Sequence, residues 1–130
     1  MTERLALLLG VGWLAATVAL PAHHNFASEF DANQPVTVTG AVTRLEWKNP
    51  HVWFYVDAKS DAGEVSSWGM EMGSPNGLIR AGWTRHAMAV GDVVTVEGFR
   101  ARNGATIANA RTVTLTKTGQ KLFAASSQGQ

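Results

Sequence analysis

Hydrophobic and polar positions alternate along several stretches after residue 35, and this period is typical of half-buried β-strands. The stretches are rich in valine, threonine and aromatic residues, and short segments with glycine, asparagine, aspartate or proline separate them. The predicted strands are 36–47, 51–58, 65–72, 90–101 and 106–116, with a short sixth within 117–123. On the second strand, the alternation assigns Val52, Phe54 and Val56 to the interior.

The segment between the third and fourth strands has a different pattern and predicts a short helix. Ser74 suits the N-cap and Pro75 suits the first helical position. Gly40, in the middle of the long first strand, indicates a bulge or a sharp bend. Three strands, a helix and then two strands form the order of an OB-fold, a small Greek-key β-barrel. The sequence therefore predicts an all-β, OB-fold-like barrel over residues 36–123, with five to six strands and one short helix.

Residues 1–22 are predicted to be a signal peptide. Residues 5–20 form an uncharged apolar run of 16 residues, shorter than the ~20 that a membrane-spanning helix needs. Ala22 is a small residue at the expected cleavage position, and an uncleaved N-terminal anchor is the alternative. We therefore expect a bacterial protein that is exported to the periplasm or secreted, with no stable membrane span after cleavage. Residues 23–35 would form a leader, and residues 124–130 a disordered tail.

The composition excludes several classes of function. The chain has 11 basic and 10 acidic residues, and this balance gives no basic footprint for nucleic acid. It has no cysteine, which excludes disulfides, thiolate ligands and thiol nucleophiles. The acids show no glycosidase spacing, and the common hydrolase and phosphate-binding motifs are missing. Non-catalytic binding is therefore favoured, with a hydrolase that uses Ser74 and His86 as the weaker alternative.

Three blocks of the sequence are distinctive: 22–57, 72–83 and 90–115. Together they resemble a family of small exported bacterial proteins, the domain of unknown function 6152 family. The characteristic residues are His23, His24 and Phe26, then Asn49, Pro50 and His51, then Gly73, Ser74, Pro75 and Asn76. The resemblance covers nearly all of residues 23–123. It implies a secreted or periplasmic β-barrel, and it implies no activity.

Two adjacent histidines would open the mature chain if cleavage follows Ala22. An N-terminal His23 combines a free α-amine with an imidazole, a nitrogen pair that chelates Cu(II), and His24 could add a donor. His51 begins the second strand at the rim of the barrel and is the candidate for a third imidazole. Copper bound by these three residues is the most specific prediction, and its affinity should fall as pH drops. The alternative is that the two N-terminal histidines are merely polar residues at a frayed terminus.

The third strand offers a weaker set of copper ligands. Met70 and Met72 share a face with Trp68, and a histidine lies on the neighbouring strand. This arrangement is similar to the Cu(I) site of the small periplasmic silver- and copper-binding chaperones that have an OB-fold, and thioethers suit Cu(I). The resemblance is confined to this strand. The alternative is that Met70 and Met72 belong to the hydrophobic core.

The second strand predicts a different kind of site. Trp53 and Tyr55 share its outer face, and in an OB-fold the second and third strands form the usual binding surface. Trp53, Tyr55 and, on the third strand, Trp68 are therefore candidates to bind a glycan or an exported protein partner. The competing interpretation is that the leader, with Phe26 and Phe30, lies across this face and buries it.

Overall fold

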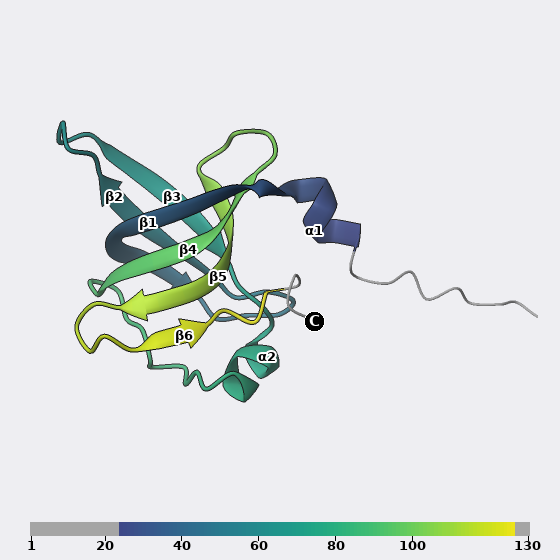
Figure 1. The fold of residues 1–130 in the computed structure, drawn as a ribbon. Helices are drawn as coiled ribbons and strands as arrows, with labels where there is room; N and C mark the ends of the chain where they lie inside the picture. The colour runs from purple at the N-terminus through teal and green to yellow at the C-terminus, as the bar shows by residue number, and fades with distance from the viewer. Residues whose placement is uncertain (1–23, 127–130) are drawn as a thin grey trace, which may run out of the picture.

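The chain folds into a small β-barrel (Figure 1). One short helix precedes the first strand, and another comes between the third and fourth strands. A computed structural model describes residues 24–126. The elements of this part are α1 (His24–Glu29), β1 (Phe30–Glu46), β2 (Trp53–Lys59), β3 (Val65–Glu71), α2 (Pro75–Arg80), β4 (Val93–Ala101), β5 (Ile107–Leu115) and β6 (Lys121–Phe123).

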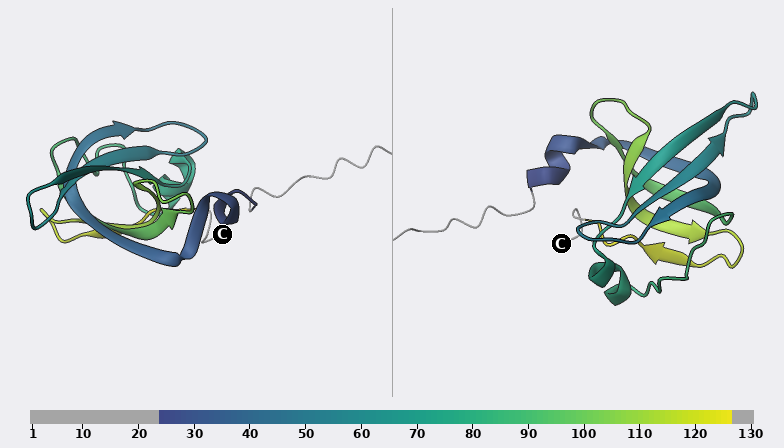
Figure 2. Two further views of the ribbon diagram at one scale, coloured as in Figure 1. Left: turned by 90° about the horizontal axis from the view of Figure 1, so that it is seen from above. Right: turned by 180° about the vertical axis from the view of Figure 1, so that it is seen from behind.

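The strands form one sheet that closes on itself. Their order is β3-β2-β1-β4-β5-β6, and an additional parallel pairing joins β3 to β5. Figure 2 shows the resulting ring of strands in the view from above. A closed barrel with this order, and with a helix between β3 and β4, has the OB-fold arrangement. The predicted fold class is confirmed, and β6 adds a short strand to the outer edge of β5.

β1 is long because it pairs with both halves of the barrel. Its first part is antiparallel to β4 and its last part is antiparallel to β2. Gly40 lies where these two pairings meet, and a Cβ atom there would overlap the backbone carbonyl of Asp57. The bulge itself comes slightly later, as a shift in register between Val42 and Arg44. Gly40 therefore permits a close approach of two strands beside the bend.

The inward side chains form the hydrophobic core of the barrel. Val52, Phe54 and Val56 are each 0% exposed, as the alternation predicts. Met70 and Met72 are equally buried and pack in the same core. Because its own side chains occupy the interior, the barrel leaves ligand sites to its outer surface and its loops.

α2 closes one end of the barrel and begins as the sequence predicts. The Ser74 hydroxyl accepts a hydrogen bond from the Gly77 amide at 3.1 Å, and Pro75 is the first helical residue. After the helix, the Trp83 indole donates to the Phe123 carbonyl at 2.9 Å. The segment between β3 and β4 is thereby attached to β6.

The leader folds beside the barrel, not across the Trp53 face. The Phe26 ring of α1 lies 5.7 Å from the Phe30 ring and 6.0 Å from the Phe99 ring, between centroids. With Ala101, these side chains form a hydrophobic cluster separate from the main core. The interpretation that the leader lies across the Trp53 and Tyr55 face is therefore wrong. The phenylalanines of the leader cover an apolar surface of β4 instead. The first strand also begins at Phe30, earlier than the predicted start at 36.

The C-terminal end of the described chain belongs to the core. Ala124, Ala125 and Ser126 are all buried. The Gly73 amide donates to the Ala124 carbonyl at 2.9 Å, and the Ala124 amide donates to the Arg111 carbonyl at 2.7 Å. The barrel domain therefore extends through Ser126, past the boundary expected at 123.

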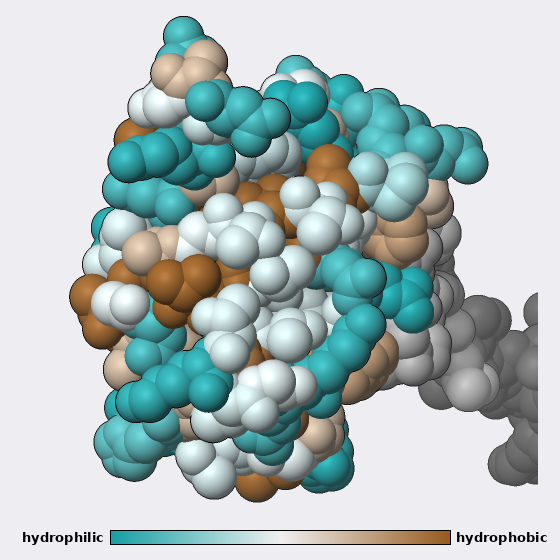
Figure 3. Space-filling model, turned by 60° about the vertical axis from the view of Figure 1, so that its left-hand side comes forward, coloured by the Kyte–Doolittle hydropathy of each residue, from teal (hydrophilic) through white to brown (hydrophobic). Residues whose placement is uncertain are grey.

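The exposed large hydrophobic side chains of the described residues are spread over distant elements. Val65, Ile79 and Val90 are the most exposed of them. Figure 3 shows one face of the molecule, on which residues of intermediate hydropathy cover much of the surface and hydrophobic residues form small groups among them. This face therefore offers no broad apolar area for a partner. Among residues 24–126, no helix is long and apolar enough to cross a membrane.

Candidate ligand-binding site

The outer face of β2 and β3 carries two aromatic rings above a glycine. The Trp53 and Tyr55 ring centroids are 6.5 Å apart, and the ring planes are inclined by only 23°. Gly69 lies opposite Tyr55 on β3. A Cβ atom at Gly69 would be 3.3 Å from the Tyr55 ring and 3.7 Å from the Trp53 ring. Both rings therefore extend across β3, and the absence of a side chain at Gly69 leaves room for them.

The two rings line an open pocket of about 510 Å³, a size within the range of small-molecule sites. The β4–β5 loop and the start of β5 complete one side, and the loop after β1 completes another. Besides the two rings and Gly69, the lining residues are Glu46, Lys48, Ser67, Thr106 and Ile107. The pocket therefore occupies the β2–β3 face and the two loops with which OB-folds bind ligands.

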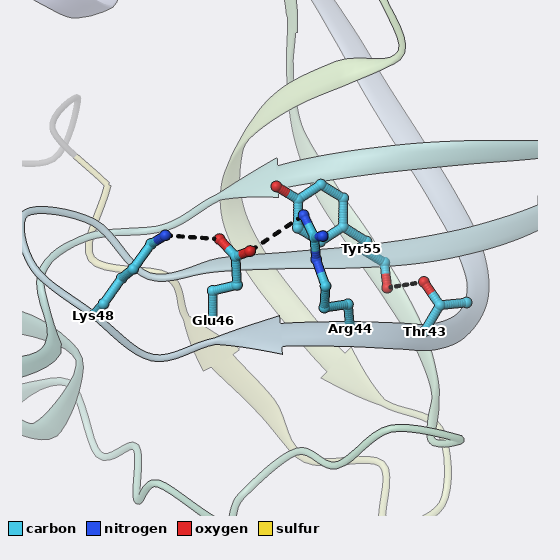
Figure 4. A network of polar contacts seen from close by, with 5 residues as sticks. All are labelled: Thr43, Arg44, Glu46, Lys48 and Tyr55. Atoms are coloured by element: carbon cyan, nitrogen blue, oxygen red, sulfur yellow. Dashed lines mark hydrogen bonds and ion pairs between the residues drawn. The ribbon is translucent and has the colours of Figure 1, made fainter.

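A chain of charged contacts borders this pocket (Figure 4). The Arg44 guanidinium lies over the Tyr55 ring, 4.1 Å from its centroid, and its Nη2 is 3.2 Å from Glu46 Oε1. Lys48 Nζ is 3.2 Å from Glu46 Oε2. Thr43 Oγ1 donates to the Tyr55 carbonyl at 3.3 Å. Such exposed pairs add little stability, but they place hydrogen-bond donors and acceptors of both charges at the rim.

A second open pocket, of about 350 Å³, adjoins the first. Trp53 and Ile107 line both pockets. The other lining residues come from the end of α1, the start of β1 and the β4–β5 loop, and they are Ser28, Glu29, Phe30, Ala101, Arg102 and Asn103. The two pockets therefore share a wall that Trp53 and Ile107 form, and we refer to the pair of pockets as the groove.

A buried carboxyl group lies next to this groove. Glu71, opposite Trp53 on β3, is 8% exposed, and Asn109 Nδ2 donates to its Oε1 at 3.2 Å. Burial raises the pKa of Glu71, whereas His51, when its ring is protonated, and the hydrogen bond from Asn109 act in the opposite direction. Asn109 Oδ1 is buried and has no hydrogen-bond partner among the described residues. The folded protein therefore favours the neutral form of Glu71 more than water does.

The histidines predicted to bind copper are only partly described by the structure. His51 is half-buried, and its Nδ1 lies 3.1 Å from the Met72 carbonyl oxygen. Because a carbonyl only accepts, Nδ1 carries the proton, and Nε2 of the neutral ring keeps its lone pair. His23 lies outside the described residues, and His24 is placed only as the first residue of α1. Within residues 24–126, no group of three or more His, Cys, Asp or Glu side chains could hold a metal ion.

Trp68 and Met70 lie on the opposite face of β3 from the groove, and Met72 directly follows the end of β3. Trp68 pairs with Val56 and Met70 pairs with Phe54, and both partners point into the barrel. Met70 and Met72 are core residues, and Trp68 is half-buried at the edge of the core. The structure therefore brings the two aromatic residues of β2 together but separates them from the third predicted aromatic residue and from the methionines.

Sequence reasoning missed the part of the groove that β5 and its preceding loop provide. Thr106 and Ile107 reach the aromatic pair through the parallel β3–β5 pairing, in which Gly69 lies opposite Ile107. No local pattern reveals such a long-range pairing. The predicted OB-fold was the available signal, because that fold places the β4–β5 loop beside the second and third strands.

The chain matches a known protein family over most of its length. Residues 12–110 match a family of unknown function, DUF6152. The chain belongs to this family. The matched range includes every residue that lines the two pockets. No curated protein matches the chain. Membership in the DUF6152 family assigns no activity to this protein.

Proposed function

We propose that this protein is a non-catalytic carbohydrate-binding module that holds a glycan on the outer face of β2 and β3. The observation that carries the proposal is the aromatic pair of Trp53 and Tyr55, which lies across Gly69 in the wall of an open pocket. The C–H-rich face of a pyranose packs against such rings. Glu46 and Lys48 at the rim supply charged partners for sugar hydroxyl groups.

Charge and shape favour a glycan over other ligand classes. The chain has a net charge of +1, and Arg44 and Lys48 beside the pocket are both paired with Glu46. A nucleic-acid site needs an unbroken track of positive charge. A protein-docking site commonly has an apolar centre with little charge, whereas this site is hollow and has charged side chains at its edge. A sugar combines apolar faces with hydroxyl groups and suits both features.

The pocket beside the aromatic pair supports binding without hydrolysis. Glycoside hydrolysis needs two carboxyl groups on opposite sides of one glycosidic bond. In the pocket beside the aromatic pair, the lining carboxylate is Glu46, and Arg44 and Lys48 flank it as ion-pair partners. This pocket therefore places one carboxyl group beside a bound sugar, whereas hydrolysis needs two.

A glycan array tests the proposal directly. The protein, expressed with its own N-terminal segment and then purified, is expected to retain a defined set of glycans. Trp53→Ala and Tyr55→Ala should each lose about fivefold in affinity, because each removes a stacking surface worth about 1 kcal/mol. Thr95→Ala on the far side of the barrel is the matched control. Retention by the Trp53→Ala, Tyr55→Ala double variant, or no retained glycan at all, would contradict the proposal.

Copper binding through His23, His24 and His51 is a second candidate function. It is favoured by the His51 ring, which a backbone carbonyl holds through Nδ1 so that Nε2 is left for a ligand. Histidines that bind metals are commonly oriented in this way. We also propose export to the periplasm or beyond, because the first 22 residues have the pattern of a signal peptide.

One mass measurement tests both of these proposals. The exported protein should have the intact mass of a chain that begins at His23, and it should gain one tightly held copper from one equivalent of Cu(II). His51→Ala should lose that copper to a weak chelator, whereas His86→Ala, which changes an exposed histidine, should keep it. A different mature terminus, or equal loss of copper from both variants, counts against the copper site.

A further inference from the structure

We propose that the ligand is a linear oligosaccharide that occupies both pockets, and that α1 forms one wall of its second subsite. This inference rests on the proposed carbohydrate binding and adds the length of the ligand and a role for the leader. The two pockets have volumes of about 510 and 350 Å³. Because Trp53 and Ile107 line both, the two subsites adjoin one another, and one continuous chain fits them better than two separate ligands.

The two subsites repeat the same chemistry on either side of Trp53. The first has Glu46 and Lys48 in its lining, and the second has Glu29 and Arg102. Each therefore combines the shared apolar wall with one acidic and one basic side chain. A polymer whose successive units present the same faces and hydroxyl groups matches this repetition.

The second subsite is formed before any ligand arrives. The Arg102 amide donates to the Glu29 carbonyl at 2.9 Å, and Arg102 Nε donates to the Ala27 carbonyl at 2.6 Å. These bonds hold α1 against the β4–β5 loop, and in Figure 1 both lie at the same end of the barrel. Inside the loop, Asn103 Oδ1 accepts from the Ala105 amide at 3.0 Å. A preformed wall lowers the ordering cost of binding, so added sugar units can contribute to affinity.

The length dependence of binding tests the inference. The probes are β-1,4-linked N-acetylglucosamine and its oligomers of two to six units, measured by isothermal titration calorimetry. We expect the dissociation constant to fall at least about tenfold from the single sugar to the dimer or trimer, and to change little for longer chains, because the groove is then filled.

Substitutions on α1 separate the two subsites. Ser28→Phe fills the second pocket and should reduce the affinity for long oligomers to that for the shortest bound sugar. Ala27→Phe adds similar bulk at the neighbouring position, whose side chain is exposed and does not line the pocket, and should keep the full length dependence. Ser28→Ala should also keep the full length dependence. This variant shows whether the effect of Ser28→Phe comes from filling the pocket or from losing the Ser28 hydroxyl group. Tyr55→Ala should weaken binding at every length.

The outcomes are distinguishable. Binding that does not depend on length, or an unchanged length dependence in Ser28→Phe, overturns the two-subsite groove and leaves the single glycan site standing. Failure to bind both these oligomers and oligomers of any glycan that the array retains overturns the groove, and an empty array overturns the carbohydrate proposal as well.

Discussion

Single residues set the shape of the groove and the response of the fold to pH. Gly69 leaves the space that the Trp53 and Tyr55 rings cover. Glu71 lies beside that surface as a buried acid that shares one hydrogen bond with Asn109. Burial of a carboxyl group without a full set of partners is costly when the group is charged. The ionisation of Glu71 should therefore destabilise the barrel.

The first prediction concerns Glu71. The pKa of Glu71 is raised in the folded state. The neutral carboxyl group therefore contributes its full stability to the fold below the ordinary carboxyl pKa, and this contribution is lost as pH rises through the raised pKa. Glu71→Gln removes the buried charge, and its amide can donate to the unpartnered Asn109 Oδ1. At neutral pH we expect a gain of about 1 kcal/mol, or roughly 4 °C in Tm. Thermal melts from acidic to neutral pH should show the gain growing with pH.

Glu97→Gln is the matched control, and its effect on Tm should be opposite to that of Glu71→Gln. Hydrogen bonds from Lys121 and Thr112 hold the pKa of Glu97 below its usual range. This exposed carboxylate therefore stabilises the fold above the ordinary carboxyl pKa, and the effect is lost as pH falls. Glu97→Gln should lower Tm slightly at neutral pH and leave it unchanged in acid. If Glu71→Gln also lowers Tm at neutral pH, the charged form of Glu71 does not destabilise the fold.

The elements of the fold could largely be predicted from the sequence. The alternation of Val52, Phe54 and Val56 gave the correct interior face, and Ser74 and Pro75 marked the start of α2. These features are local and follow from side-chain spacing. The early start of β1, the position of α1 and the β5 side of the groove could not be predicted, because each depends on contacts between residues far apart in the chain.

The second prediction tests the close approach of strands at Gly40. A Cβ atom there would overlap backbone atoms of β2, which cannot move aside as a flexible side chain can. Gly40→Ala should therefore cost about 3 kcal/mol or more in the free energy of unfolding, measured by chemical denaturation. Gly63→Ala, in an open turn at φ 84°, should cost about 1–2 kcal/mol from backbone strain alone. Equal losses would argue against the clash.

The third prediction concerns the attachment of α1. Phe26 packs in the small cluster with Phe30 and Phe99, separate from the main core. Phe26→Ala should therefore free α1 without unfolding the barrel. Hydrogen exchange should show lost protection at the Arg102 amide, which donates to Glu29, and unchanged protection at the Val96 amide in β4. A uniform loss of protection would mean that α1 and the barrel unfold together.

At the scale of the whole molecule, the barrel has a packed core, and the proposed ligand site lies on its outer surface. α2 and the segment Ala124–Ser126 close one end, and buried side chains of the described residues pack in the interior. The β3–β5 pairing closes the ring and brings the β4–β5 loop to the aromatic pair. The DUF6152 match spans this arrangement. We propose that this molecule binds its ligand on the Trp53–Tyr55 surface.

The measurement that tests this claim most directly is an NMR titration of the ¹⁵N-labelled protein with the glycan that the array retains most tightly. We predict saturable shifts of the Trp53 indole N–H and of the Tyr55, Ser67 and Thr106 amides. The Trp83 indole, which is hydrogen-bonded to Phe123 near α2, should not shift. Shifts centred on Trp83 or on the Thr39–Thr95 side of the barrel, with none at Trp53, would contradict the account.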